Sequence, residues 1–481
     1  MKSRLNVVLA LASCFACATV QALPAFPLKY GADSRYLVDQ NDVPFPIMGR
    51  TAWFVVSLSV SDYQVFVDDT AARGYNSIEF HVLNHDPRGN NPPFNGNGGL
   101  PFVRDLSGNN WNGQSGTPDF TTPNEAYWTF VDEFLAYCES RGLLVFVFPA
   151  YVGYVGGDQG WMQEIVANGP TKMQVYGAWL ATRYKDRKNL VWMMGGDMGT
   201  PPDTFNAAQT AVESALLTGL NSIAGQQSVF FSAEWESQSI ATDQTTFGIS
   251  MSLNGAYSWS GDVNTHGRRA YAHAPVTPAF LLEEPYDEEG PDGNNVNPSA
   301  TQPVRRFQWW GWLSTIGGYI SGNGYVWPFN SQWRAHLDTQ GSRDMARLNA
   351  FIQSIAWHKL VPSNLAGMKT LITAGGSTFA STSYVAASAA QDGTLLVAYV
   401  PPSHTGSISV DMSAMGGPTR ARWFDPTNAA YTLIGSDLAN SGTRSFSTPG
   451  TNSAGQTDWV LVLDTSSGTV PEAPTNLRVI N

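Results

Sequence analysis

Short apolar segments alternate with amphipathic helical patterns between about residue 45 and residue 361. The apolar segments carry few charges, which is typical of strands buried on both faces of a parallel sheet. The pattern predicts strands over residues 46–51, 75–83, 143–149, 190–194, 228–232, 247–252, 278–283 and 316–321.

Between these strands, apolar residues recur three and four positions apart, which is the spacing of one helix face. The clearest case is the segment 124–141, where Tyr127, Phe130, Val131 and Phe134 follow this spacing. Helices are predicted over residues 61–73, 124–141, 171–187, 207–223, 304–315 and 344–358. Eight such units over about 300 residues predict a (β/α)8 TIM barrel, because an open sheet rarely needs so many repeats.

The pattern changes after the last helix, and short strands separated by turns follow without a helical repeat. Strands are predicted over residues 394–400, 407–412, 419–424 and 459–463, which is typical of a β-sandwich of about 100 residues. We therefore predict a barrel with an N-terminal β-hairpin over residues 23–362 and a β-sandwich over residues 367–465, packed together across a short connection. Residues 466–481 are rich in Ser, Gly and Pro and resemble a linker that opens a fibronectin type III module.

Residues 1–22 are predicted to be a signal peptide, because Lys2 and Arg4 precede an apolar stretch and Ala22 fits a small-residue cleavage site. The residues before Cys14 also resemble a lipoprotein cleavage site, which would leave a lipid anchor on this cysteine. Both alternatives place the protein outside the cytoplasm. We expect it to be secreted or periplasmic, or else a cell-surface lipoprotein.

Composition and charge exclude several partners. The formal net charge is −12, which argues against nucleic acid and anionic membrane surfaces. No segment after the leader approaches the roughly 20 apolar residues of a membrane span. Cys138 is alone in the mature chain, so a disulfide framework and a thiolate zinc site are excluded. The 16 Trp, 18 Tyr and 24 Phe modestly favour a carbohydrate-binding protein, although packing explains most aromatic residues.

One connection is unusually long. Residues 86–124 are dense in Gly, Asn and Pro, and a loop of this length inside a compact domain is usually functional. Because it follows the end of a predicted strand, we expect it to lie on the catalytic face and to form one wall of the site. Trp111 and Phe120 would anchor it.

Two predicted strand ends carry carboxylates, and barrel enzymes place their catalytic groups at such ends. Gly195 and Gly196 allow a sharp turn that presents Asp197 after the fourth strand, and Glu284 follows the seventh. Glu283 and Glu284 cannot both point into the site, because side chains alternate along a strand. Two facing carboxylates are the catalytic groups of most glycoside hydrolases.

Other candidates would bind sugar hydroxyls or stack on sugar rings, with packing as the alternative for each. His81 and His85 straddle a strand end rather than lying on a helix, so we predict sugar contacts and no metal site. The remaining candidates lie near other strand ends: Trp53, Glu234, Trp235, Tyr257, Tyr286 and Trp327. Motifs of esterases, kinases and zinc proteases are not found, and no cofactor is predicted.

Several motifs resemble the apiosidase family of bacterial glycoside hydrolases, and the resemblance extends over roughly residues 28–464. The most specific are residues 192–197 and the pair Glu284-Pro285. Residues 421–426 are similar to a module often labelled collagen-binding, a label that the fold alone does not justify. The other matching segments are residues 36–39, 44–53, 71–76, 123–124 and 141–143.

The resemblance implies a barrel followed by a β-sandwich, with Asp197 as acid/base and Glu284 as nucleophile. The chain departs from the family pattern at Glu283, where a Gly is usual, and at Tyr286-Asp287, which directly follows the Glu-Pro pair. The loop after the seventh strand therefore differs from the family. We expect a raised pKa for Asp197, caused by burial against Trp192 and by repulsion from Glu284.

The sequence thus predicts a secreted, apiosidase-like glycoside hydrolase that acts on a plant or microbial polysaccharide or oligosaccharide, with a retaining two-carboxylate mechanism. One alternative is a non-catalytic carbohydrate-binding or adhesion protein with a degenerate barrel. Another is a polysaccharide lyase, which the acidic charge disfavours because lyases usually need a basic groove.

Overall fold

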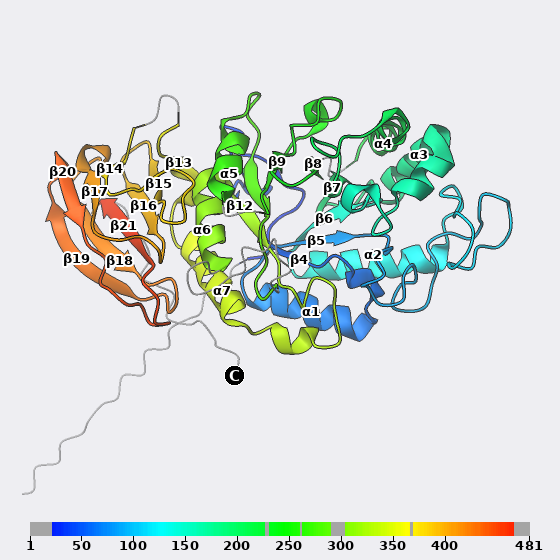
Figure 1. Cartoon of the computed structure of the whole chain (residues 1–481), viewed down its shortest axis with the longest axis horizontal. Coiled ribbons are helices and arrows are strands. Elements are labelled where there is room, and N and C mark those ends of the chain that lie inside the picture. Colours follow the sequence, from blue (N-terminus) through cyan, green and yellow to red (C-terminus); the bar gives the residue numbers. More distant parts are fainter. Residues whose placement is uncertain (1–21, 227–229, 260–261, 290–303, 366–368, 466–481) are drawn as a thin grey trace, which may run out of the picture.

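Eight parallel strands form the barrel that the hydrophobic pattern predicts (Figure 1). The computed structural model describes residues 22–226, 230–259, 262–289, 304–365 and 369–465. The predicted leader and the tail 466–481 lie outside the described residues, apart from Ala22. The barrel strands are β4 (Ile47–Thr51), β5 (Ser77–His81), β6 (Leu144–Phe148), β7 (Leu190–Gly195), β8 (Phe230–Glu234), β10 (Asn254–Tyr257), β11 (Ala279–Glu283) and β12 (Ile316–Ser321).

The barrel has one seam, between β8 and β10. The sheet order runs β8-β7-β6-β5-β4-β12-β11-β10-β9, where β9 (Ser239–Ile240) pairs antiparallel with β10. At the seam, the backbone N–H groups of Ser252 and Leu253 donate to the carbonyl of Phe231 in place of a regular ladder. The barrel is therefore nearly closed.

Among the residues that the structure describes, seven α-helices surround or flank the strands, and capping side chains fix where several of them begin. The side chain of Ser59 accepts from the backbone N–H of Asp62 at the start of α1, and Asn124 accepts from Ala126 at the start of α2. None of the described helices has the length and apolar character needed to cross a membrane. The helices are α1 (Val60–Ala72), α2 (Glu125–Ser140), α3 (Met162–Arg183), α4 (Ala207–Leu220), α5 (Val263–Ala272), α6 (Val304–Thr315) and α7 (Gln340–Gln353).

Strand alternation divides the barrel residues into an inner and an outer set. On β6, for example, Phe146 and Phe148 pack inside the barrel, whereas Val145 and Val147 pack against the helices. The inner set fills the lower part of the barrel with apolar side chains, so a substrate site is left only at the carboxyl ends of the strands. The inner apolar residues include Ile47, Phe146, Phe148, Val191, Met193, Phe280, Leu282 and Ile320.

Several elements differ from the sequence prediction, and helix α7 begins four residues before its predicted start and ends five residues before its predicted end. The sixth strand is Asn254–Tyr257 rather than residues 247–252, which contain the 3₁₀ turn Gly248–Ser250. The helix Val263–Ala272 was not predicted. Helix α3 begins at Met162, nine residues before the predicted start, because it continues across a kink where Gly169 has a φ of 76° before Pro170.

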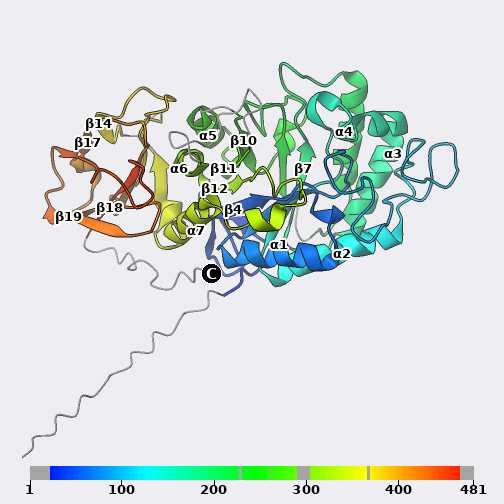
Figure 2. The same ribbon diagram turned by 60° about the horizontal axis from the view of Figure 1, so that its bottom comes forward.

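The C-terminal region forms two antiparallel sheets that lie beside α6 and α7 in both views (Figures 1 and 2). The larger sheet contains β13 (Leu360–Pro362), β15 (Ala386–Ala390), β16 (Leu395–Val400), β21 (Trp459–Thr465), β18 (Thr419–Phe424) and β19 (Tyr431–Leu438). The smaller sheet contains β14 (Ile372–Ala374), β17 (Ile408–Asp411) and β20 (Thr443–Phe446). A small N-terminal sheet contains β1 (Lys29–Tyr30), β2 (Leu37–Val38) and β3 (Pro44–Phe45).

Candidate active site

Asp197 is presented by a tight turn directly after β7. Gly195 and Gly196 have φ values of 77° and 122°, and Asp197 itself has a φ of 52°. A Cβ atom on Gly196 would lie 2.1 Å from the ring of Tyr151, so only glycine fits between the turn and this ring. The left-handed backbone of Asp197 is an uncommon conformation for a residue with a side chain, and such conformations cluster at functional sites.

Two tyrosine hydroxyls hold the Asp197 carboxylate. The hydroxyl of Tyr151 donates to Oδ2 at 2.5 Å, and that of Tyr257 donates to Oδ1 at 2.8 Å. Burial raises the pKa of Asp197, while the two hydroxyl donors and Arg88 oppose the rise. The predicted contribution of Trp192 is wrong, since its side chain packs in the outer core cluster, on the helix side of β7. The carboxyl group of Asp197 is thus poised to hold a proton.

A bulge in β11 turns Glu283 toward the site. Along the parallel pair with β10, Ala256 lies opposite Leu281 but Tyr257 lies opposite Glu283, so Leu282 is an extra residue. Leu282 packs inside the barrel, and strict alternation would then send Glu283 outward. Because of the bulge, one carboxylate oxygen of Glu283 instead lies within 4.8 Å of oxygens of Asp197 and Glu234.

Glu284, the residue predicted as nucleophile, is not brought to this cluster. Its side chain is fully buried, and its Oε1 accepts a hydrogen bond from Nε2 of Gln308 on α6. Burial, followed by repulsion from Glu283 and Glu289, raises its pKa well above the usual range. The structure therefore corrects the predicted pairing: Glu283 faces Asp197, and Glu284 contacts the helix layer.

Two further carboxyl groups face the same space. Glu234 lies at the end of β8, where the sequence predicts it, and its side chain is 1% exposed. Glu79 of β5 is fully buried, and neither of its carboxylate oxygens has a hydrogen bond. Burial and the carboxylate of Glu283 raise the pKa of both well above the usual range, with Asp197 adding to the effect on Glu234. Because charged carboxylates this close repel one another, the cluster must share protons.

An aromatic wall lines one side of the cluster. His81 is stacked between Tyr151, 4.0 Å away between ring centroids, and Trp53, 4.8 Å away. The indole N–H of Trp53 donates to the Tyr286 hydroxyl at 3.1 Å, and this hydroxyl donates to Oε1 of Glu283. Burial lowers the pKa of His81 well below its usual range, so this ring is neutral. The structure therefore gathers four of the predicted residues at the site, namely Trp53, His81, Tyr257 and Tyr286.

The other predicted residues are placed differently. The partly exposed Trp327 lies at the rim, with the guanidinium of Arg88 4.7 Å from the centre of its ring. His85 lies apart from the carboxylates, where its ring contacts the Asp158 carbonyl at 2.9 Å and the Glu164 carboxylate at 3.4 Å. Trp235 is fully buried on the outer face of the barrel, and its indole N–H donates to the Ala241 carbonyl. Trp235 cannot stack on a sugar.

Only the beginning of the long loop 86–124 reaches the site. This part of the loop contains Arg88, whose charge acts on Asp197 and whose guanidinium forms an ion pair with Asp86 at 2.5 Å. Farther along, the loop packs against α2 and α3, where the indole N–H of Trp128 donates to the Pro101 carbonyl and Asn168 donates to the Pro118 carbonyl. These contacts place the second half of the loop against α2 and α3, and its beginning beside the carboxylates.

Sequence reasoning missed Tyr151, Glu283, Arg88 and Trp259. Tyr151 follows the end of β6, so the same strand-end rule that selected Asp197 could have found it. Trp259 follows β10 and packs edge-on against Tyr286 with 5.1 Å between ring centroids. The bulge that reorients Glu283 has no sequence signal as clear.

Asp197, Glu234 and Glu283 are the one set of carboxylates in the described part of the chain spaced closely enough to hold a metal ion. However, both oxygens of Asp197 already accept hydrogen bonds from tyrosines. The arrangement is better suited to exchanging protons and binding hydroxyl groups than to coordinating a cation.

Comparisons with known proteins agree with this geometry. A family model described as "Apiosidase-like, catalytic domain" matches residues 31–359, and one described as "Putative collagen-binding domain of a collagenase" matches residues 370–464. A solved structure described as "Glycoside hydrolase" is 20% identical, with 93% of this chain and 100% of that chain covered at a TM-score of 0.73. A glycoside hydrolase family 5 structure from Bacteroides vulgatus ATCC 8482 is 19% identical, with 93% and 95% covered at a TM-score of 0.73. No curated protein sequence matches significantly.

Proposed function

The chain belongs to the apiosidase-like family, whose model matches residues 31–359, and from this premise we propose that it is a secreted retaining glycoside hydrolase. Family and fold together support a glycosidase. The observation that carries the finer proposal is the close approach of the Asp197 and Glu283 carboxylates, within 4.8 Å, from the ends of β7 and β11, which β8 and β10 separate around the barrel.

The spacing favours retention of anomeric configuration. Retaining enzymes hold their two carboxyl groups about 5 to 5.5 Å apart, whereas inverting enzymes need about 6.5 to 9.5 Å to admit a water molecule. We assign Glu283 as the nucleophile rather than Glu234, because Glu234 lies on the strand next to Asp197. A nucleophile must approach the sugar from the face opposite the departing oxygen.

In the first step, Asp197 donates a proton to the glycosidic oxygen while Glu283 attacks the anomeric carbon. A covalent glycosyl–enzyme intermediate forms and the leaving group departs as an alcohol. In the second step, Asp197 removes a proton from water, which attacks the same carbon and releases Glu283. The raised pKa of Asp197 supplies the proton for the first step.

The tyrosines hold these two groups in their roles. The hydroxyls of Tyr151 and Tyr257 fix the orientation of Asp197, and the hydroxyl of Tyr286 donates to Glu283. Burial, followed by the Asp197 carboxylate, raises the pKa of Glu283 well above its usual range, and the hydrogen bond from Tyr286 opposes this rise. Glu234 and His81 are assigned to sugar hydroxyls, and Trp53 to a sugar ring. Arg88 is already paired with Asp86, so the acidic mouth favours a neutral sugar over a uronic acid.

The experiment that tests this proposal is turnover of a panel of plant and microbial polysaccharides and aryl glycosides, with the first-formed anomer followed by NMR. We expect the released sugar to have the anomeric configuration of the substrate. An inverted product would contradict the nucleophile role of Glu283, leaving it as a general base.

Export is the second part of the proposal, and it depends on residues 1–22. We expect protein purified from the periplasm or the medium to begin at Leu23, which mass spectrometry of the N-terminus would show. A mature chain beginning with a lipid-modified Cys14 would instead identify a cell-surface lipoprotein.

A further inference from the structure

Helix α6 is buried along its whole length between the barrel and the β-sandwich. All 12 of its residues, Val304 to Thr315, are buried, including two arginines. In a barrel the outer helices usually expose one face to water, so the sandwich takes the place of solvent on this helix. Figure 1 shows α6 lying between the strands of the barrel and those of the sandwich.

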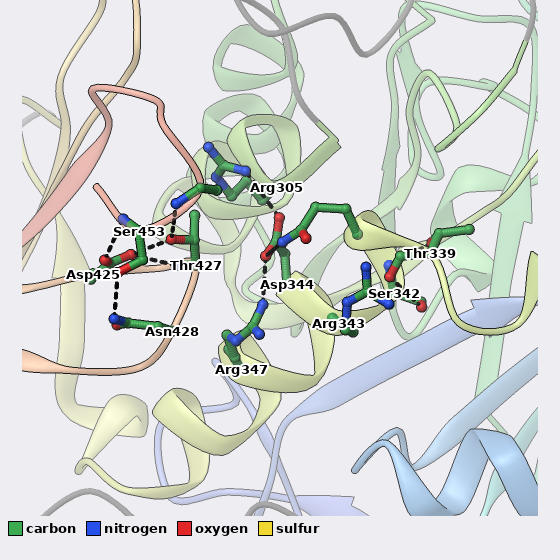
Figure 3. Close-up of polar contacts among 12 residues, drawn as sticks. Arg305, Thr339, Ser342, Arg343, Asp344, Arg347, Asp425, Thr427, Asn428 and Ser453 are labelled. Atoms are coloured by element: carbon green, nitrogen blue, oxygen red, sulfur yellow. Dashed lines mark hydrogen bonds and ion pairs between the residues drawn. The ribbon is translucent and has the colours of Figure 1, made fainter. Parts of the chain in front are cut away.

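Arg305 joins the sandwich to the helix layer through two buried carboxylates. It donates to both oxygens of Asp458, at 2.6 and 2.7 Å, and to Asp344 of α7 at 2.9 Å. Asp458 precedes β21 in the sandwich and also accepts from the Tyr399 hydroxyl at 2.8 Å. All three charged groups are at most 2% exposed, so this network is shielded from solvent and salt. Figure 3 shows Arg305 pointing toward Asp344 of α7.

Further contacts orient α6 against the sandwich. The indole of Trp309 is parallel to the Tyr399 ring, with 2° between their planes, and the indole N–H of Trp310 donates to the Tyr384 carbonyl at 3.0 Å. The Ser388 hydroxyl donates to the Leu313 carbonyl at 2.8 Å. Rotation and sliding of the helix are therefore both restrained by the sandwich.

The opposite face of α6 contacts the strand that carries the proposed nucleophile. Gly311 lies so close to β11 that a Cβ atom there would be 2.3 Å from the Leu281 side chain. Gln308, one turn after Arg305, donates to Glu284, the residue next to Glu283. A continuous set of contacts thus runs from Asp458 through Arg305 and Gln308 to the bulge of β11.

The sandwich itself offers little to a sugar ligand. Among its described residues, all the aromatic side chains except Phe379 are at least partly buried, and the Arg268 guanidinium of α5 lies 5.0 Å from the centre of the Phe379 ring. Carbohydrate-binding platforms need aromatic faces open to solvent. The buried aromatics of this region instead serve the core and the contact with α6.

We propose that the β-sandwich is a buttress that fixes α6 and thereby positions Glu283, rather than a module that binds collagen or carbohydrate. This inference rests on the proposed role of Glu283. Asp458, Arg305 and Gln308 are then positioning residues, which act through Glu284 and the β11 bulge without touching substrate.

The test compares two buried aspartates of the sandwich in the full-length protein. Asp458→Asn weakens the bond to Arg305 of the barrel, whereas Asp464→Asn weakens ion pairs with Arg420 and Arg422 inside the sandwich. Both carboxylates are at most 1% exposed, which makes the second variant a matched control. We expect both to lower the melting temperature, but only Asp458→Asn to lower kcat, by about tenfold to a hundredfold, with a smaller change in KM.

A second variant covers the case in which Asp458→Asn does not fold. Gln308→Met removes the donor to Glu284 and leaves the sandwich contacts of Arg305 intact. We expect kcat to fall by about tenfold and the acid limb of the pH–rate profile to shift, because the surroundings of Glu283 change. Wild-type kcat and pH profile in this variant, or equal kcat in the two aspartate variants, would overturn the proposal.

Calorimetry separates failure of this inference from failure of the proposed function. We expect the wild type to unfold in a single transition, and Asp458→Asn to unfold in two, because the domains then melt separately. This result does not depend on any substrate. Two transitions in the wild type would refute the buttress, whereas the absence of glycoside turnover would refute the function alone.

Discussion

The mouth of the barrel and the contact with the sandwich both bury acidic side chains, and they treat the charge in opposite ways. At the mouth of the barrel, oxygens of Asp197, Glu234 and Glu283 lie within 4.8 Å of one another and are held by tyrosine hydroxyls. At the contact with the sandwich, Asp344 and Asp458 are equally buried, but both pair with Arg305.

The difference shows how a fold separates catalytic from structural carboxylates. A buried carboxylate beside a guanidinium contributes a fixed contact, which is costly to break. A buried carboxylate among other carboxylates must share protons with them, and this makes it useful as an acid or a base. Burial is common to both groups; Asp344 and Asp458 pair with Arg305, whereas Asp197, Glu234 and Glu283 lie among other carboxylates.

The largest effect is expected at Glu283. Replacing it with Gln should reduce kcat by at least about 10⁴-fold, because the nucleophile is lost while the volume and the hydrogen bond to Tyr286 can be retained. Glu284→Gln is the control: its contact with Gln308 is preserved, so the loss should stay below about tenfold. Steady-state kinetics on one aryl glycoside compares the two. If Glu284→Gln were the inactive variant, the original assignment of Glu284 would be restored.

The second effect concerns Asp197 and depends on the leaving group. Asp197→Asn should lose about 10³-fold on a natural glycoside, within the usual range for general acid–base catalysis, and far less when the leaving group needs no protonation. For the wild type we expect activity to fall as the pH rises through the raised pKa of Asp197, since the proton is then lost. Equal losses on activated and natural substrates would contradict the acid role.

The third effect lies at the contact with the sandwich and is one of stability. Arg305→Met leaves the buried carboxylate of Asp458 without its guanidinium and leaves Asp344 with Arg347 alone, so it should lower the free energy of unfolding by about 3 to 5 kcal/mol. Arg420→Met provides a control, because its guanidinium pairs with Asp464 but is 36% exposed and backed by Arg422, so the loss should be about 1 kcal/mol or less. Denaturant titration measures both. Similar losses in the two variants would remove the distinction between the buried network and an ordinary ion pair.

The smallest effect is expected at Glu213, a buried carboxyl on α4 whose two oxygens accept no hydrogen bond from another side chain. Burial raises its pKa from 4.5 to about 8, while the backbone N–H of Gly195 opposes the rise. The folded state therefore keeps a proton that the unfolded chain releases at lower pH, so stability falls as the pH rises from about 4.5 to about 8.

Glu213→Gln should remove this part of the pH dependence. We expect the variant to match the wild type near pH 4 and to exceed its stability by about 1 to 3 kcal/mol above pH 8, in denaturant titrations across this range. If the free energies of unfolding of the wild type and the variant changed with pH in parallel, the ionisation of Glu213 would have no effect on folding stability.

The barrel could be predicted from the sequence because its strands and helices carry strong periodic patterns. The sixth strand, Asn254–Tyr257, could not, since Asn-Gly-Ala-Tyr is short and weakly apolar while the preceding residues 247–252 are more hydrophobic. The helix Val263–Ala272 is rich in polar and charged residues, which hid its apolar face.

The sequence predicts which strand ends form the site, but it does not predict which side chains at those ends point into the barrel. Glu234 and Tyr257 follow the alternation of their strands, and the two glycines before Asp197 indicate the turn that presents it, so these positions could be predicted. The choice between Glu283 and Glu284 depends on a single extra residue, Leu282, whose effect arises from pairing with β10. Trp235 was misjudged because the position after Glu234 points to the helix side, where its indole completes a core.

The burial of α6 also bears on how such enzymes can be recombined. The two family models divide the chain between residues 359 and 370, which suggests a site where modules could be exchanged. Removing the sandwich at this division would expose four buried residues of α6 to water, namely Arg305, Arg306, Trp309 and Trp310. The exposed surface would be partly apolar and therefore prone to aggregation. The transferable unit in evolution or in enzyme engineering is therefore the chain through Thr465, and a foreign module belongs after that residue rather than in place of the sandwich.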